Sequence, residues 1–146
     1  MEKISFVILT WNSEKTIENC LNSITHVCQS QNLEYEIHIV DNGSADNTVQ
    51  IILGNADSAR IHLIRLPKNL GTTRTRNRAL RKCTGDIICI MDSDAAMLEG
   101  DLRALTDTLR ADFSIGILAP RLIFSGGAIQ HSARKFPTLF QKLSRI

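Results

Sequence analysis

Residues 4–28 read ISFVILTWNSEKTIENCLNSITHVC, and this stretch contains two different periodicities. Its first part, Ile4–Thr10, is a nearly continuous run of apolar and β-branched residues, which is typical of a buried strand. Its second part repeats apolar residues at helical spacing, and Ser13 is a plausible N-cap for that helix. The expected buried face of the helix holds Ile17, Cys20, Leu21, Ile24, Val27 and Cys28.

The same alternation continues along the chain. Further strands are predicted at Tyr35–Val40, Ile61–Leu66, Ile87–Met91 and Ile115–Ala119. A short helix through Leu53 is predicted, with Asp46 as its cap. Further helices are predicted from Thr72 to Cys83, with Gly85 as the C-terminal cap, and from Asp101 to Asp112. Strands that alternate with helices predict right-handed βαβ units. We therefore expect an α/β fold, a mostly parallel sheet with helices on both faces.

The pattern changes beyond Pro120. Leu122–Phe124 and Ala128–Gln130 flank a Ser-Gly-Gly turn, which favours a hairpin. Pro137 suits the first turn of a terminal helix whose apolar face would hold Leu139, Phe140, Leu143 and Ile146. We expect residues 1–120 to form the α/β domain and residues 121–146 to form a hairpin and an amphipathic helix. That unpartnered face suggests a domain truncated at its C-terminal end, a second copy of the chain or a membrane surface.

Charge is segregated along the 146 residues, although the net charge is only +2. Eight Lys/Arg and no acid occur between Arg60 and Lys82, whereas acids gather around Asp41 and Asp92. Such segregation suits an anionic ligand near basic loops and a cation held by carboxylates. A solvated basic helix face is the simpler alternative.

The four cysteines form no C-x-x-C pair and no zinc-spaced cluster with histidine. They are interpreted as small buried residues in a reducing compartment. No stretch is long enough to span a membrane, and Met1 leads directly into a strand. We expect a cytoplasmic protein, with peripheral attachment to the inner face of the membrane left open.

Polar residues follow four of the predicted strands. Ligands bind beyond the carboxyl ends of the strands in an open parallel sheet. Two carboxylates two residues apart, Asp92 and Asp94, can share Mg²⁺ or Mn²⁺ with a diphosphate. The alternative for this D-x-D pair is a turn or a helix cap. The residues expected at this edge are Thr10, Trp11, Asn12, Asp41, Asn42, Asn69, Gly71, Arg74, Arg76, Asp92, Ser93 and Asp94.

Each of these residues also has a simpler interpretation. Asp41 is placed to accept hydrogen bonds from a ribose or base, or else to form an Asx-turn. Arg74 and Arg76 begin a helix, where anions bind, or else they are solvated. Trp11 is placed to stack on a base or simply to pack. The histidines at 26, 38 and 62 are interpreted as structural.

Three segments carry a family resemblance: VILTWNSEKTIENCLNSI, YEIHIVDNGSADNT and LPKNLGTTRTRNRALRKCTGDIICIMDSDA. In this order they resemble the amino-terminal part of a family 2 glycosyltransferase of GT-A fold. The resemblance implies that Thr10 and Asn12 contact the nucleotide, and that Asp41 binds the base or ribose. It further places Arg76 near the diphosphate and Asp92 and Asp94 at the metal. Asp41-Asn42 departs from the Asp-Asp that is commoner in the family. Together with the segment ARKFP at residues 133–137, this departure suggests a resemblance to rhamnosyltransferase-like members of the family.

The resemblance also implies the reaction, an inverting transfer from a nucleotide-diphosphate sugar to a hydroxyl of a glycan or lipid-linked acceptor. No nucleic-acid partner is expected, and a homo-oligomer is left open. Such transfer needs a general base, which similar proteins supply from a carboxylate well after the D-x-D motif. No Asp or Glu follows Asp112, and only His131 could titrate there. We expect these residues to bind the donor and to lack the catalytic base.

Three other classes compete with this hypothesis. A dinucleotide-binding oxidoreductase would need G-x-G-x-x-G after the first strand, and the sequence has none there. A haloacid-dehalogenase-like phosphatase places D-x-D after its first strand, not its fourth. A non-catalytic nucleotide-binding or interaction module of the same fold fits the sequence as well as an enzyme does.

Overall fold

The computed structural model describes residues 3–98, 100 and 102–130. Four strands form one sheet: β1 (Lys3–Thr10), β2 (Glu34–Asp41), β3 (Ile61–Arg65) and β4 (Ile87–Asp92). The helices are α1 (Ile17–Ser30), α2 (Thr48–Leu53), α3 (Thr72–Leu80) and α4 (Leu102–Ala111), with a 3₁₀ turn, η1, at Ser58–Arg60. The predicted α/β fold is confirmed.

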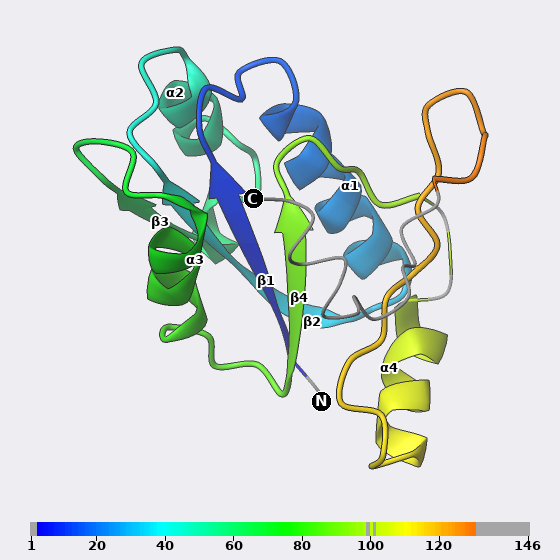
Figure 1. Cartoon of the computed structure of the whole chain (residues 1–146). Coiled ribbons are helices and arrows are strands. Elements are labelled where there is room, and N and C mark those ends of the chain that lie inside the picture. The colour runs from blue at the N-terminus through cyan, green and yellow to red at the C-terminus, as the bar shows by residue number, and fades with distance from the viewer. Residues whose placement is uncertain (1–2, 99, 101, 131–146) are drawn as a thin grey trace, which may run out of the picture.

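The sheet has the strand order β3-β2-β1-β4, and every pair is parallel. Thr10 is the register partner of Asp41, Leu9 that of Asp92, and Asp41 that of Arg65. The ends of all four strands therefore meet at one edge, to which the arrowheads of β1 and β4 point in Figure 1. We call it the carboxyl edge.

One face of the sheet packs on α1 and α4. Every residue predicted for the apolar face of α1 is buried, and Leu102 of α4 joins the same cluster. Phe6, the largest fully buried side chain, meets Tyr35 edge-on with ring centroids 6.4 Å apart. Burying side chains of this size stabilises the fold by about 1.5–3 kcal/mol each.

The opposite face packs on α3, so helices lie on both faces (Figure 1). Val7 and Val40 of the sheet contact Leu66 and Ala79 on this side. Because α3 packs against β1 and β2, the edge strand β4 is uncovered here, and its Ile90 is 52% exposed.

Two predicted helix boundaries are wrong. α1 begins at Ile17 with Thr16 as its N-cap, because Ser13 offers its carbonyl, not its hydroxyl, to the first turn. α3 ends at Leu80, not Cys83, because the chain turns away and Thr84 donates its backbone N–H to buried Glu36. The predicted caps therefore have other contacts.

Gly85 is not a helix cap. A Cβ on Gly85 would lie 2.6 Å from Lys3 O and 2.7 Å from Ser5 N, so glycine is needed where this segment crosses the start of β1. Its backbone N–H donates to Ser5 Oγ at 2.8 Å.

The predicted fifth strand is also wrong. Residues 115–119 form no strand, and Ile117 is 91% exposed. Within the described residues no strand pairs with this segment, so it lacks the backbone hydrogen bonds of a sheet.

The predicted hairpin is confirmed by an antiparallel bridge between Ile123 and Ile129. The helix predicted from Pro137 lies outside the described residues. Within the described ranges, no helix is both long enough and apolar enough to cross a bilayer.

Candidate functional site at the carboxyl edge

The loops that follow β1 and β2 are joined by hydrogen bonds. Asn12, in a left-handed conformation (φ 51°), donates its N–H to Ser44 Oγ at 2.9 Å. Its side-chain Oδ1 accepts the N–H of Ala45 at 2.8 Å. Thr10 O accepts the N–H of Asn42 at 2.9 Å. The two loops therefore form one ordered segment of the carboxyl edge.

Asp41 lies beneath its own turn. It is 2% exposed, and both carboxylate oxygens lie 3.3 Å from the backbone nitrogen of Ser44. Gly43 makes this turn possible, since its φ is +82° and a Cβ there would lie 2.7 Å from Lys68 Cα. The Asp41 carboxylate has a local structural role here, and a nucleotide role stays a prediction.

Asn42 connects the end of β2 to the start of α3. Its Nδ2 donates to Asn69 Oδ1 at 2.9 Å. Its Oδ1 accepts the N–H of Leu70 at 2.9 Å and the hydroxyl of Thr75 at 3.1 Å. Asn69 Oδ1 also accepts the N–H of Gly71. Asn42 is 3% exposed, and its side chain bonds groups in the loop before α3 and in α3 itself. The only sign of this role in the sequence is the position of Asn42 directly after a strand.

We expect Asn42→Asp to destabilise the chain by about 1–3 kcal/mol, because a carboxylate cannot donate to Asn69 Oδ1 and is costly to bury. Urea denaturation followed by circular dichroism measures the change. Asn77→Asp on the exposed surface of α3 is the matched control and should change little. Equal losses in the two variants would show that the Asn42 network does not hold this loop.

Arg76 and Asp92 bring α3 and β4 together. Arg76 Nη2 donates to Asp92 Oδ1 at 2.7 Å, with the two side chains 25% and 72% exposed. Ser93 Oγ lies 2.9 Å from Ser13 Oγ, and Cys20 Sγ contacts Asp92 O at 3.7 Å. Cys20 is a buried thiol, and burial raises its pKa to about 12, so it supports the site as a packed apolar group.

The carboxylates of the D-x-D pair fit a hard divalent cation. Asp92 and Asp94 are exposed, and both are oxygen donors of the kind that Mg²⁺ and Mn²⁺ prefer. Nearby, Arg76 Nε and Thr10 Oγ1 are buried and lack hydrogen-bond partners within the part of the chain that the structure describes. Buried polar atoms are usually paired, so each of these two atoms is available for a further hydrogen bond.

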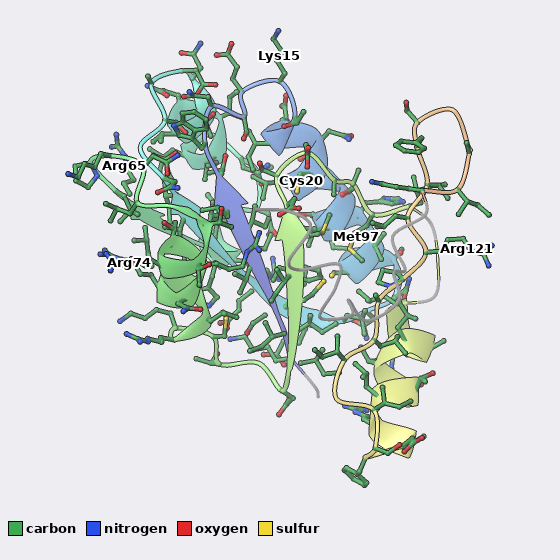
Figure 2. All side chains as sticks on the ribbon, in the orientation of Figure 1. Lys15, Cys20, Arg65, Arg74, Met97 and Arg121 are labelled. Carbon is green, nitrogen blue, oxygen red and sulfur yellow. The ribbon has the colours of Figure 1, made fainter. Side chains whose placement is uncertain are left out.

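The remaining predicted residues also lie at or near this edge. Trp11 is 54% exposed, which leaves its indole face accessible for stacking. Gly71 is the N-cap residue of α3 with φ +81°, and its own N–H donates to Asn69 Oδ1 at 2.9 Å. Figure 2 shows Arg74 pointing outward from α3, away from β4, as expected for a solvated residue.

Known proteins resemble this chain in sequence and in fold. The profile of the family described as "Glycosyl transferase family 2" matches residues 5–145. The structure resembles that of S. aureus TarS in complex with UDP-GlcNAc, with 29% identity over 75% of this chain and a TM-score of 0.66. It also resembles the mannosyltransferase PcManGT from Pyrobaculum calidifontis in complex with GDP-Man and Mn²⁺, with 26% identity over 79% and a TM-score of 0.69.

The chain covers about a third of these two proteins, 31% of the TarS chain and 34% of PcManGT. What it shares with them is the parallel α/β sheet described above, and the family profile extends over nearly all of the sequence. By the extent of this match, the chain belongs to glycosyl transferase family 2.

Proposed function

We propose that this chain binds a nucleotide-diphosphate sugar together with Mg²⁺ or Mn²⁺ at its carboxyl edge. We further propose that it serves an inverting transfer of the sugar to a hydroxyl of a glycan or lipid-linked acceptor. In this proposal residues 1–120 bind the donor and residues 121–146 begin the acceptor side.

The observation that carries the proposal is the contact between Arg76 and Asp92 at the edge that also holds Asp41. It places a guanidinium against an exposed carboxylate of the D-x-D pair, so that cation and anion sites adjoin. Similar structures bind UDP-GlcNAc and GDP-Man, both of which carry a diphosphate. A diphosphate with a divalent cation fits such a pair of sites.

Each residue then has a distinct task. Asp92 and Asp94 would hold the cation. Arg76 would contact the diphosphate once Asp92 is shared between Arg76 and the cation. Thr10, Trp11, Asn12 and Asp41 bind the nucleoside, while Asn69, Gly71 and Ser93 line the edge between the two. The bound cation would stabilise the negative charge that develops on the nucleoside diphosphate leaving group.

The general base is proposed to lie outside the residues named so far. Asp92 and Asp94 are assigned to the cation, and Asp41 is buried under Ser44. Glu14 accepts hydrogen bonds from Asn47, which hold it at the start of α2. His131 lies outside the described residues. We therefore expect donor binding without sugar transfer from these 146 residues.

Calorimetry with UDP, TDP and GDP, each with and without Mn²⁺, tests the binding proposal. At least one nucleotide should bind, and Mn²⁺ should increase its affinity. If none binds, or if the affinity ignores the metal, the proposal fails. Incubation with UDP-GlcNAc or GDP-Man and an oligosaccharide acceptor tests the second part, and robust turnover would place the base within these residues.

We expect Asp41→Ala to weaken the binding of nucleosides and of nucleotides equally, by about 1–3 kcal/mol. This is the usual cost of a lost hydrogen bond to a charged group. The effect should persist without metal. A loss seen only in the presence of Mn²⁺ would place Asp41 at the cation instead. Because Asp41 also bonds Ser44, the melting temperature of the variant must be measured in parallel.

A further inference from the structure

Three side chains that the proposed function does not use gather on the α3 side of the sheet. Glu36, His38 and Val40 lie two residues apart along β2 and so share one face of the sheet, the face on which Val40 packs toward α3. His62 is the register partner of His38 on β3, and the two imidazole rings stack with centroids 4.8 Å apart and planes 23° apart. We call these residues the Glu36–His38–His62 cluster.

The cluster brings together side chains of the kinds that ligate transition metals. One donor atom from each residue lies within 4.8 Å of the others. His38 and Glu36 are each 6% exposed at the side chain, whereas His62 is open to solvent. An ion could therefore reach the cluster from the His62 side and still contact buried donors.

The buried Nε2 of His38 faces Glu36. It lies 3.0 Å from Glu36 Oε1, in a contact poorly aligned for a hydrogen bond, and it has no other partner within the described part of the chain. Leaving a buried polar atom unpaired is costly. A metal bound at Nε2 would satisfy it.

Glu36 is held in place as ligating carboxylates commonly are. Its Oε1 accepts the hydroxyl of Ser5 at 2.6 Å and the N–H of Thr84 at 2.8 Å, and Lys3 pairs with Oε2. Burial raises the pKa of Glu36, but the contacts with Lys3, Ser5, Thr84 and His38 outweigh it and hold that pKa well below its usual range. Outer contacts of this kind orient the ligands of protein metal sites.

An open cavity of about 530 Å³ adjoins the cluster. It is lined by Glu36, His38, His62, Leu63, Ile64, Lys82 and Thr84. Three protein ligands leave one position of a tetrahedral ion free, and the cavity gives that position room for water.

We propose that the Glu36–His38–His62 cluster binds a transition-metal ion of the Zn²⁺ type. Two imidazole nitrogens and one carboxylate oxygen suit Zn²⁺, whereas Mg²⁺ and Mn²⁺ prefer oxygen alone. The ion would cross-link β2 and β3, and it would share the Glu36 carboxylate with Lys3.

This site is separate from the D-x-D pair. Glu36 is the cross-strand neighbour of Ser5 and Asp92 that of Leu9, so the two lie four residues apart along the sheet. Four residues of strand span about 13 Å.

Titration of the tag-free chain with Zn²⁺ in excess Mg²⁺ tests the proposal, because Mg²⁺ occupies oxygen sites without competing for imidazole. We expect one equivalent of Zn²⁺ to bind. His62→Ala should lower the affinity for Zn²⁺ by at least roughly 10–100-fold, which is the cost of losing a residue that only hydrogen-bonds a metal ligand. His26→Ala, an exposed histidine on α1, is the matched control and should bind like the wild type.

Cys83 is the main competing ligand, because its thiol lies near Ser5 and Glu36. Co²⁺ distinguishes the two, since thiolate ligation adds a near-ultraviolet charge-transfer band that imidazole and carboxylate do not give. We expect visible bands without it, and an unchanged spectrum in Cys83→Ser. Binding that survives His62→Ala, or that only Cys83→Ser removes, would overturn the proposal. Failure of either metal test would leave the proposed nucleotide binding unaffected, because neither test involves the D-x-D pair.

Discussion

Replacing Asp94 by asparagine should abolish the Mn²⁺-dependent part of nucleotide affinity while leaving the free energy of unfolding unchanged. The side chain is exposed just beyond β4, where it contributes little to the core. Asparagine keeps its size but removes the negative charge that a hard cation needs. The dissociation constant without Mn²⁺, divided by that with Mn²⁺, should therefore fall to about 1. Each tenfold decrease in this ratio corresponds to about 1.4 kcal/mol of binding free energy.

A matched variant separates this effect from a general loss of negative charge. Asp107→Asn removes an exposed carboxylate from α4 and should bind nucleotide with the same Mn²⁺ dependence as the wild type. Asp92→Asn should behave differently from both, because Asp92 also pairs with Arg76. Its loss would free the guanidinium, so some metal-independent affinity for the diphosphate should remain or increase. If Asp94→Asn keeps the full Mn²⁺ dependence, Asp94 is not a metal ligand.

The general position of the candidate site could be predicted because it depends on topology. Apolar runs that end at Thr10, Asp41 and Asp92, with helical patterns between them, predict parallel strands whose carboxyl ends coincide. The buried face of α1 could be predicted for a similar reason, since helical periodicity marks a face without further knowledge of its partner. The first prediction rests on the order of elements along the chain, and the second on spacing within one element.

What the sequence could not predict depends on contacts between distant elements. The bonds of Asn42 to Asn69, Leu70 and Thr75 require a known register of β2 against the loop before α3. The stacking of His38 on His62 likewise requires the β2–β3 register, which alternation alone does not fix. Histidines 38 and 62 were interpreted as structural because no partner could be placed from the sequence.

The helix ends were mispredicted for a related reason. Ser13 and Gly85 are residue types typical of helix caps, and each lies near the end of a helical pattern. The structure places Ser13 against Ser93, and Gly85 against the start of β1. Both residues are therefore determined by long-range packing. The type of residue was informative, but its partner was eighty positions away.

We expect Gly85→Ala to be among the most destabilising single substitutions in this chain. A Cβ would lie 2.6 Å from Lys3 O and 2.7 Å from both Ser5 N and Ser5 Oγ, and two of these atoms belong to the backbone of β1. β1 pairs with both β2 and β4, so it cannot move away without disturbing two ladders.

The loss has two parts. Forcing extra volume into a packed site costs about 1–3 kcal/mol. Displacement of the segment also weakens the bonds from Gly85 N to Ser5 Oγ and from Asp86 N to Lys3 O, each worth about 1 kcal/mol. A total of roughly 3–5 kcal/mol corresponds to a fall in melting temperature of about 10 °C for a chain of this size.

Gly116→Ala is the control for this substitution. Apart from its chain neighbours, no atom of the described residues lies within 4 Å of a Cβ built on Gly116. Its φ is not in the left-handed region, so alanine should be tolerated there. Differential scanning calorimetry of both variants makes the comparison. A Gly85→Ala melting temperature within about 2 °C of the Gly116→Ala value, a difference of less than about 1 kcal/mol, would mean that β1 and the segment before β4 do not approach as closely as the structure has them. Because Ser5 and Thr84 also orient Glu36, the same variant should lose Zn²⁺ affinity at the Glu36–His38–His62 cluster even at temperatures where it remains folded.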